Sequence, residues 1–97
     1  MSTNNPILEI LKEEKPYLQK NFGVLSLGLF GSYAQNKETT DSDVDLLVEL
    51  KEPRYEFLVG VQMHLEAKLG KHVDVIRKRQ GMSERFLRRI EKDICYV

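Results

Sequence analysis

The chain of 97 residues has little of what marks secreted or membrane-spanning proteins. Its one cysteine, Cys95, cannot form a disulfide within the chain, which favours a reducing compartment. Residues 1–6 lack the basic, apolar and cleavage regions of a secretory signal. The longest nearly apolar run, residues 24–30, is far shorter than the roughly 20 residues that cross a bilayer. We therefore expect a cytoplasmic protein without a membrane span.

Net charge is also absent, because 15 Lys and Arg balance 15 Asp and Glu. A protein that coats nucleic acid is strongly basic, so this balance argues against that class. The balance is an average: residues 1–70 carry 7 basic and 11 acidic side chains, and residues 71–97 carry 8 and 4. The basic segment could face an acidic partner, a nucleic acid or a nucleotide, or be a solvated helix face with local pairs such as Glu84 with Arg88. No aromatic residues interleave with its charges, so we do not expect direct nucleic-acid binding.

The apolar pattern predicts alternating helices and strands in one domain, residues 1–97. Pro16 predicts a kink or interruption of the first helix. The strand at 24–30 is expected to be buried on both faces, because apolar residues occupy both of its alternating positions. The predicted class is α/β (α+β), a small mixed β-sheet of three to four strands flanked by about four helices. Helices are expected at about 6–22, 32–37, 53–69 and 84–93, and strands at 24–30, 43–50 and 72–76.

Asp43 and Asp45 are the most informative residues of the sequence. Strand positions i and i+2 point to the same face, about 7 Å apart at Cα, so the two carboxylates can converge on one site. Anions held together repel each other unless a cation neutralises them. Oxygen ligands without a histidine or cysteine partner favour Mg²⁺ or Mn²⁺ over Zn²⁺. The alternative is a solvated strand face with two acidic residues.

A Gly-Ser pair, Gly31 and Ser32, follows the first strand and precedes the acidic strand by about ten residues. Glycine permits close backbone approach, and the serine hydroxyl and following N–H groups can donate to phosphate oxygens. Alone, the pair would be an ordinary turn. Phosphate donors on one side and metal-binding carboxylates on the other together indicate a nucleotide site.

Nucleotidyltransferases of the polymerase-β-like superfamily have a signature that closely resembles two segments of this chain, Gly31-Ser32-Tyr33-Ala34-Gln35-Asn36 and Asp41-Ser42-Asp43-Val44-Asp45-Leu46-Leu47-Val48. More narrowly, the chain is similar to minimal nucleotidyltransferase (MNT) domain proteins of the MntA antitoxin type. The resemblance implies the nucleotidyltransferase fold, with two Mg²⁺ or Mn²⁺ ions as cofactors and ATP as a substrate. It assigns catalysis and metal binding to Asp43, Asp45 and Asp74, and the triphosphate to Gly31 and Ser32.

Asp74 is unusual even without the resemblance, because it lies mid-strand between Val73 and Val75, where a carboxylate requires a cation or a strong donor. Three converging carboxylates suit two metal ions about 3.5–4 Å apart. The resemblance places Asp74 on the side of the attacking hydroxyl. His72 adjoins this strand and could either touch the site or be an ordinary histidine.

The chain departs from the family pattern at Gln35 and Asn36, where many relatives carry Arg-Gly. Asparagine can adopt the left-handed conformation of the glycine, so the backbone path is expected to be kept. Gln35 removes a positive charge near the phosphates. Lys37 could supply that charge instead, or be a solvated loop lysine.

The resemblance also implies an acceptor hydroxyl on a partner protein, a HEPN-domain toxin, and hence the antitoxin of a toxin–antitoxin pair. A chain of this size has no room for an acceptor-binding domain, so that surface is expected from a partner or from another copy in a homo-oligomer. Two alternatives stay open: a non-catalytic binding antitoxin with the same fold, and a nucleotidyltransferase acting on a small molecule, as aminoglycoside enzymes do. The sequence specifies neither the acceptor nor the base of the nucleotide.

Overall fold

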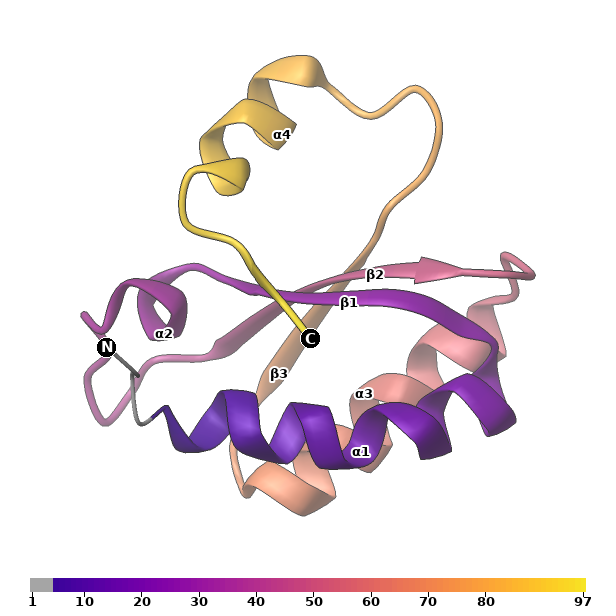
Figure 1. The fold of residues 1–97 in the computed structure, drawn as a ribbon, viewed down its shortest axis with the longest axis horizontal. Helices are drawn as coiled ribbons and strands as arrows, with labels where there is room; N and C mark the ends of the chain where they lie inside the picture. Colours follow the sequence, from indigo (N-terminus) through magenta and orange to yellow (C-terminus); the bar gives the residue numbers. More distant parts are fainter. Residues whose placement is uncertain (1–4) are drawn as a thin grey trace.

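The computed structural model describes residues 5–97; residues 1–4, which belong to the expected domain and to the N-terminal segment discussed above, lie outside the described residues. Four helices and four strands follow each other in the described part of the chain (Figure 1). The predicted class, with a small mixed sheet and about four helices, is confirmed. In chain order the elements are α1 (Pro6–Phe22), β1 (Val24–Phe30), α2 (Ser32–Gln35), β2 (Val44–Leu50), α3 (Tyr55–Leu69), β3 (Val73–Arg77), α4 (Glu84–Glu91) and β4 (Cys95–Tyr96).

The sheet has the strand order β3-β2-β1-β4. β1 pairs antiparallel with both β2 and β4, whereas β2 and β3 are parallel. Helix α3 makes the crossover between the two parallel strands, as a parallel connection requires. The parallel register sets Asp45 directly beside Asp74, and the antiparallel register sets Asp45 beside Phe30.

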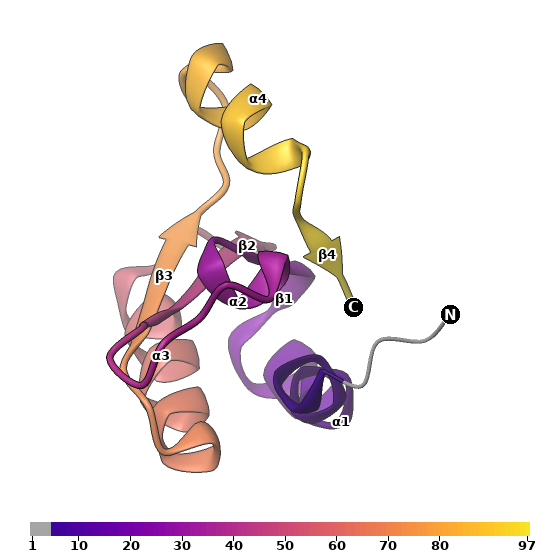
Figure 2. The same cartoon turned by 90° about the vertical axis from the view of Figure 1, so that its left-hand side faces the viewer.

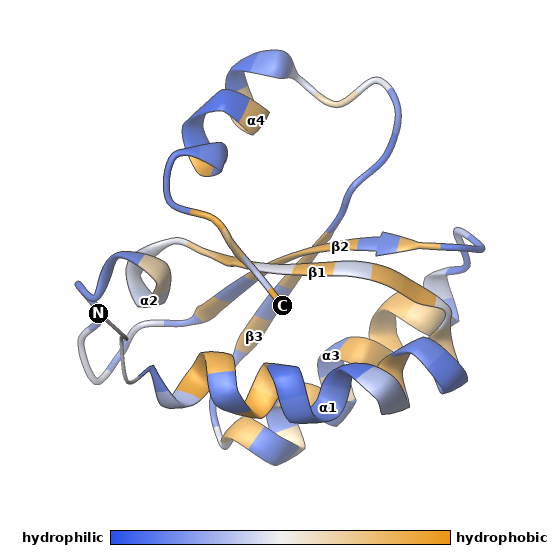
Figure 3. Cartoon of the chain, in the orientation of Figure 1, coloured by the Kyte–Doolittle hydropathy of each residue, from blue (hydrophilic) through white to orange (hydrophobic). Residues whose placement is uncertain are grey.

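The two faces of the sheet differ in what covers them. Helices α1 and α3 pack on one face and α4 stands beyond the other (Figures 1 and 2). Strands β1 and β2 are mainly hydrophobic, whereas α4 is mostly hydrophilic (Figure 3). The α1–α3 face carries the main core, which includes Leu11, Leu18, Val44, Leu46, Val48, Val61 and Leu65.

The α4 face of the sheet has only a small apolar cluster, built on Phe30, Leu47 and Ile90. The period-2 pattern of β2 explains the difference, because Asp45 and Leu47 alternate with the apolar residues of the main core. One face of β2 therefore holds the fold together, and the other face carries acidic groups.

The expectation that β1 is buried on both faces is wrong at its first half. Leu25 is 52% exposed and Ser26 is partly exposed, although residues 27–30 are buried. The reason is that the α4 cluster reaches only the Phe30 end of the second face. β4, which was not predicted, covers the middle of β1 by pairing with Gly28 and Leu29.

An interruption of the first helix at Pro16 is also wrong, because α1 is a single helix of 17 residues with Pro16 inside it. Proline removes one backbone N–H, but Pro16 is exposed, so water can hydrogen-bond the carbonyl that loses its partner. Leu11 and Leu18 are fully buried on either side of it and hold both halves of the helix against the sheet. No described helix is long and apolar enough to cross a membrane.

The main core should govern stability. We expect Leu65→Ala in α3 to lower the free energy of unfolding by about 2–5 kcal/mol, because Leu65 is fully buried and its truncation leaves a cavity. Urea denaturation measures this change. Met63→Ala on the same helix is the matched control, since Met63 is 65% exposed and should cost less than about 0.5 kcal/mol. Equal losses for the two variants would contradict the described packing of α3.

Candidate active site

Strands β2 and β3 bring the predicted carboxylates to one end of the sheet. Asp43 directly precedes β2, Asp45 is its second residue, and Asp74 is the second residue of β3. Oxygen atoms of Asp43 and Asp74 and a ring nitrogen of His72 all lie within 4.8 Å of one another. All three side chains are exposed, so a ligand from solvent can reach them.

Asp45 is not part of this cluster, but it pairs with Asp74 across the two strands and lies in a more enclosed position. Asp45 is partly buried, and this burial raises the pKa of its carboxyl. The negative charges of Asp74 and Asp43 raise that pKa further. These repulsions show that the three carboxylates act on one another electrostatically. The structure thus brings together Asp43, Asp45 and Asp74, while their catalytic and metal-binding roles stay predictions.

Gly31 allows the Gly-Ser turn to lie against the acidic strand. A Cβ atom at this position would fall on the carboxylate of Asp45, and the backbone has φ 80°, which favours glycine. Ser32 follows as the first residue of the short helix α2 and is partly exposed. The predicted phosphate-binding pair is therefore next to the predicted metal-binding strand.

The end of the turn also follows the prediction. Asn36 has φ 59° and ψ 35°, the left-handed conformation expected for a residue in place of glycine. The backbone N–H of Lys37 donates to the carbonyl of Ser32 at 2.9 Å and closes the turn. Asn36 therefore keeps the backbone path.

A pocket of about 290 Å³ joins the Gly-Ser turn to α4. Gln35 lines it, and so does Arg89 of α4. Lys37, the sequence-based candidate for the missing charge, is exposed and does not line this pocket. The lining residues are Phe30, Gly31, Gln35, Phe86, Arg89, Ile90 and Asp93.

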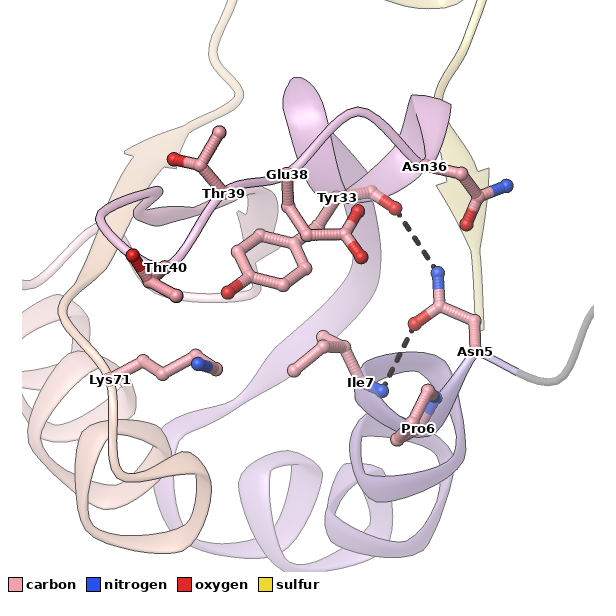
Figure 4. Close-up of a pocket in the computed structure, with 9 residues that line it drawn as sticks. All are labelled: Asn5, Pro6, Ile7, Tyr33, Asn36, Glu38, Thr39, Thr40 and Lys71. Atoms are coloured by element: carbon pink, nitrogen blue, oxygen red, sulfur yellow. Dashed lines mark hydrogen bonds between the residues drawn. The ribbon is translucent and has the colours of Figure 1, made fainter.

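Tyr33 lies inside the motif but lines a different pocket. This second pocket, of about 560 Å³, lies between the start of α1, the loop before β2 and Lys71 (Figure 4). The Asn5 side chain donates to the Tyr33 carbonyl at 3.1 Å and accepts from the N–H of Ile7 at 3.0 Å. The Tyr33 ring, with 6% exposure, is part of the main core.

His72 contacts the site, and its partner Glu66 was missed from the sequence. His72 Nε2 is 3.1 Å from Asp74 Oδ1, and Nδ1 is 3.0 Å from Glu66 Oε2. Burial by itself lowers the pKa of the His72 ring, but Asp43, Asp74 and Glu66 raise it above its usual value overall. No sequence pattern indicated Glu66, because its contact depends on how α3 docks beside β3.

The donor atoms fit a divalent cation. Exposed and mutually repelling carboxylates are ligands that Mg²⁺ and Mn²⁺ bind well. The sequence-based preference for Mg²⁺ or Mn²⁺ over Zn²⁺ assumed that no histidine lies near the carboxylates. This premise is wrong, because His72 clusters with Asp43 and Asp74.

The basic side chains of α4 are unpaired in the described part of the chain, where the ion pairs involve Arg54, His64 and His72. The expected local pair of Glu84 with Arg88 is not formed. Long exposed side chains gain little from such pairs, which explains its absence. His64 is partly buried, with Nε2 2.7 Å from Glu14 Oε1.

The sequence model of the family described as "Nucleotidyltransferase domain" matches residues 7–96. The chain belongs to this family. The expected enzyme class, nucleotidyltransferase, is therefore confirmed, and so is the resemblance on which the expectation depended.

Relatives of this nucleotidyltransferase match it over nearly its whole length. "Putative protein adenylyltransferase MJ1379" of Methanocaldococcus jannaschii is 39% identical over 101 residues, which cover all of both chains. "Protein adenylyltransferase MntA" of Thermococcus cleftensis is 37% identical over 94 residues, which cover 93% of this chain and 95% of that protein.

Solved structures share the fold of the nucleotidyltransferase. The structure of a "putative minimal nucleotidyltransferase" has a TM-score of 0.76 and 26% identity, over 96% of this chain and 95% of that one. A chain in the structure of a tri-AMPylated Shewanella oneidensis HEPN toxin in complex with MNT antitoxin has a TM-score of 0.62 and 16% identity. That match covers 91% of this chain and 69% of the other, and it concerns the fold.

The crowding of carboxylates should reduce the stability of the metal-free nucleotidyltransferase. Because the folded-state pKa of Asp45 is raised, its destabilising effect is present at neutral pH and is lost as the pH falls through that pKa. We expect Asp45→Asn to raise the metal-free melting temperature at pH 7. Mg²⁺ with ATP should then stabilise the variant less than the wild type, because less repulsion is left to neutralise.

The matched control is Asp41→Asn, at an exposed position two residues before Asp43. Its melting temperature, followed by calorimetry in the presence of a chelator, should equal that of the wild type. A metal-free Asp45→Asn protein that melts below the wild type would contradict the electrostatic account.

Proposed function

We propose that this nucleotidyltransferase is a protein adenylyltransferase that transfers AMP from ATP to a hydroxyl group of a partner protein in a reaction that depends on divalent metal ions. The observation that carries the proposal is that Asp43 and Asp74 lie in one cluster, while Asp45 pairs with Asp74 and contacts the Gly31 turn. The relatives named protein adenylyltransferases support the choice of AMP and of a protein acceptor.

Each part of the site would have a separate task. Gly31 and Ser32 would donate to the triphosphate, and Asp43 and Asp45 would hold the metal ions. Metal ions held there would supply positive charge for the phosphates and lower the pKa of the attacking hydroxyl. Asp74 would face the incoming hydroxyl from β3.

The chemical step is a displacement at the α-phosphorus of ATP. The acceptor oxygen loses its proton and bonds to the α-phosphorus, while the bond to the β-phosphate oxygen breaks and pyrophosphate leaves. The proton passes from the acceptor hydroxyl towards the carboxylates on its own side, of which Asp74 is the exposed one on β3. The products are an AMP-modified protein and pyrophosphate.

We propose that the acceptor is a HEPN-domain toxin and that this chain is its antitoxin. A structure with the same fold contains an MNT antitoxin in complex with a tri-AMPylated HEPN toxin, and this supports the choice of partner. Residues 1–97 would then act as one catalytic domain, with the acceptor surface supplied by the toxin. The single cysteine agrees with a cytoplasmic location for such a pair.

Catalysis should fail without the carboxylates. We expect Asp43→Asn or Asp74→Asn to lower label transfer from α-labelled ATP by at least about 100-fold, because bound metal contributes several kcal/mol and about 1.4 kcal/mol is tenfold. The acceptor in the assay is a HEPN-domain protein, the proposed partner. Asp41→Asn should transfer at the wild-type rate, and circular dichroism checks that each variant folds.

Undiminished transfer by either variant would show that the catalytic assignment is wrong. A binding antitoxin without catalysis is the second candidate, favoured by the uncharged Gln35 at the arginine position. Co-expression separates the two, because a purely docking antitoxin carrying Asp43→Asn would still neutralise the toxin, whereas a catalytic one would not.

Arg89 should supply the charge that Gln35 lacks, since both line the pocket that includes Gly31. We expect Arg89→Gln to weaken binding of a fluorescent ATP analogue by about 10- to 100-fold, the effect of losing a charge-assisted hydrogen bond of about 1.5–3 kcal/mol. Adding Gln35→Arg to that variant should restore much of the affinity.

Arg88→Gln on the same helix is the matched control, because Arg88 is exposed and does not line this pocket. Equal affinities for Arg89→Gln and Arg88→Gln would contradict the placement of the phosphates near α4.

A further inference from the structure

The imidazole of His72 lies between two carboxylates at the edge of the site. Nδ1 is 3.0 Å from Glu66 Oε2, and Nε2 is 3.1 Å from Asp74 Oδ1. Its backbone is fixed as well, because the His72 carbonyl accepts from the N–H of Val44 at 3.0 Å. The side chain is half-exposed, and His72 clusters with Asp43 and Asp74.

Glu66 determines which ring nitrogen carries the proton. Its Oε2 also accepts from the N–H of Val73 at 3.0 Å, and this bond, with a further one from Gln62, lowers the pKa of the Glu66 carboxyl. An ionised carboxylate accepts, so Nδ1 of His72 must donate. Without a metal ion Nε2 hydrogen-bonds Asp74 Oδ1 at 3.1 Å. In the neutral ring that metal binding requires, the proton stays on Nδ1, and the lone pair of Nε2 becomes available to a cation.

This arrangement has the form of a metal-binding histidine. Such histidines donate their other ring N–H to a carboxylate, which fixes the tautomer and the ring orientation. Two ligands about 2.1 Å from one octahedral ion lie about 3.0 Å apart when adjacent. The Nε2 to Oδ1 distance of 3.1 Å agrees with that spacing, and one ring nitrogen of His72 and one oxygen each of Asp43 and Asp74 lie within 4.8 Å of one another.

We propose that His72 is a nitrogen ligand of a divalent metal ion held with Asp43 and Asp74, and that Glu66 positions it. The inference rests on the proposed metal-dependent function and adds a ligand to its three carboxylates. Imidazole suits transition metals better than Mg²⁺, which prefers oxygen ligands and water. The site therefore binds Mn²⁺ and later transition-metal ions more tightly than Mg²⁺.

Mn²⁺ alone is the probe. Pulsed electron paramagnetic resonance of the Mn²⁺-loaded wild-type protein should show coupling to a ¹⁴N nucleus of imidazole, and His72→Gln should remove it. The same variant should weaken Mn²⁺ binding about tenfold or more, the effect usual for altered histidine ligation, while Mg²⁺ binding changes little. Glu66→Gln should keep the coupling but weaken Mn²⁺ binding, as expected of a positioning residue.

His64→Gln is the matched control, because the chain has two histidines and His64 bonds to Glu14 between α1 and α3. It should leave both the coupling and the Mn²⁺ affinity unchanged. Bound Mn²⁺ without nitrogen coupling in the wild type, or equal affinity in His72→Gln, would overturn the inference and leave the carboxylate site of the proposed function standing. Absence of Mn²⁺ binding would overturn the inference as well, whereas loss of AMP transfer with nitrogen coupling present would count against the proposed function alone.

Discussion

The parallel pairing of β2 with β3 is the constraint on which the site depends. It sets Asp45 directly beside Asp74, and the residues two positions earlier, Asp43 and His72, converge at the same end. Burial first, and then the like charges of Asp74 and Asp43, raise the pKa of Asp45, and both effects oppose folding with this group ionised. Keeping such groups together lowers the stability of the metal-free protein, and a bound cation would restore it by neutralising their charges.

The rest of the chain makes this arrangement tolerable. The face of β2 opposite the carboxylates is buried under α1 and α3, and this core provides the stability. The acidic face is covered only in part, by the small cluster of Phe30, Leu47 and Ile90. α4 is thus held close enough to bring Arg89 to the pocket beside Gly31 while most of its basic side chains stay in solvent.

Local patterns were enough to predict much of this site. The spacing of Asp43 and Asp45, the Gly-Ser turn and the left-handed Asn36 follow from strand periodicity and backbone preferences within a few residues. The role of Glu66 could not be predicted, because it depends on how α3 packs beside β3. For the same reason the exposure of Leu25 was missed, since the reach of α4 over β1 is a tertiary property.

The central claim is that the carboxylates of β2 and β3 form a metal-dependent nucleotide site. A crystal structure of the protein with Mn²⁺ and a non-hydrolysable ATP analogue, with anomalous data to locate the metal, tests it most directly. We expect anomalous peaks in contact with Asp43, Asp45 and Asp74 and the triphosphate at Gly31 and Ser32. Manganese bound elsewhere, with nucleotide away from the Gly-Ser turn, would contradict the account.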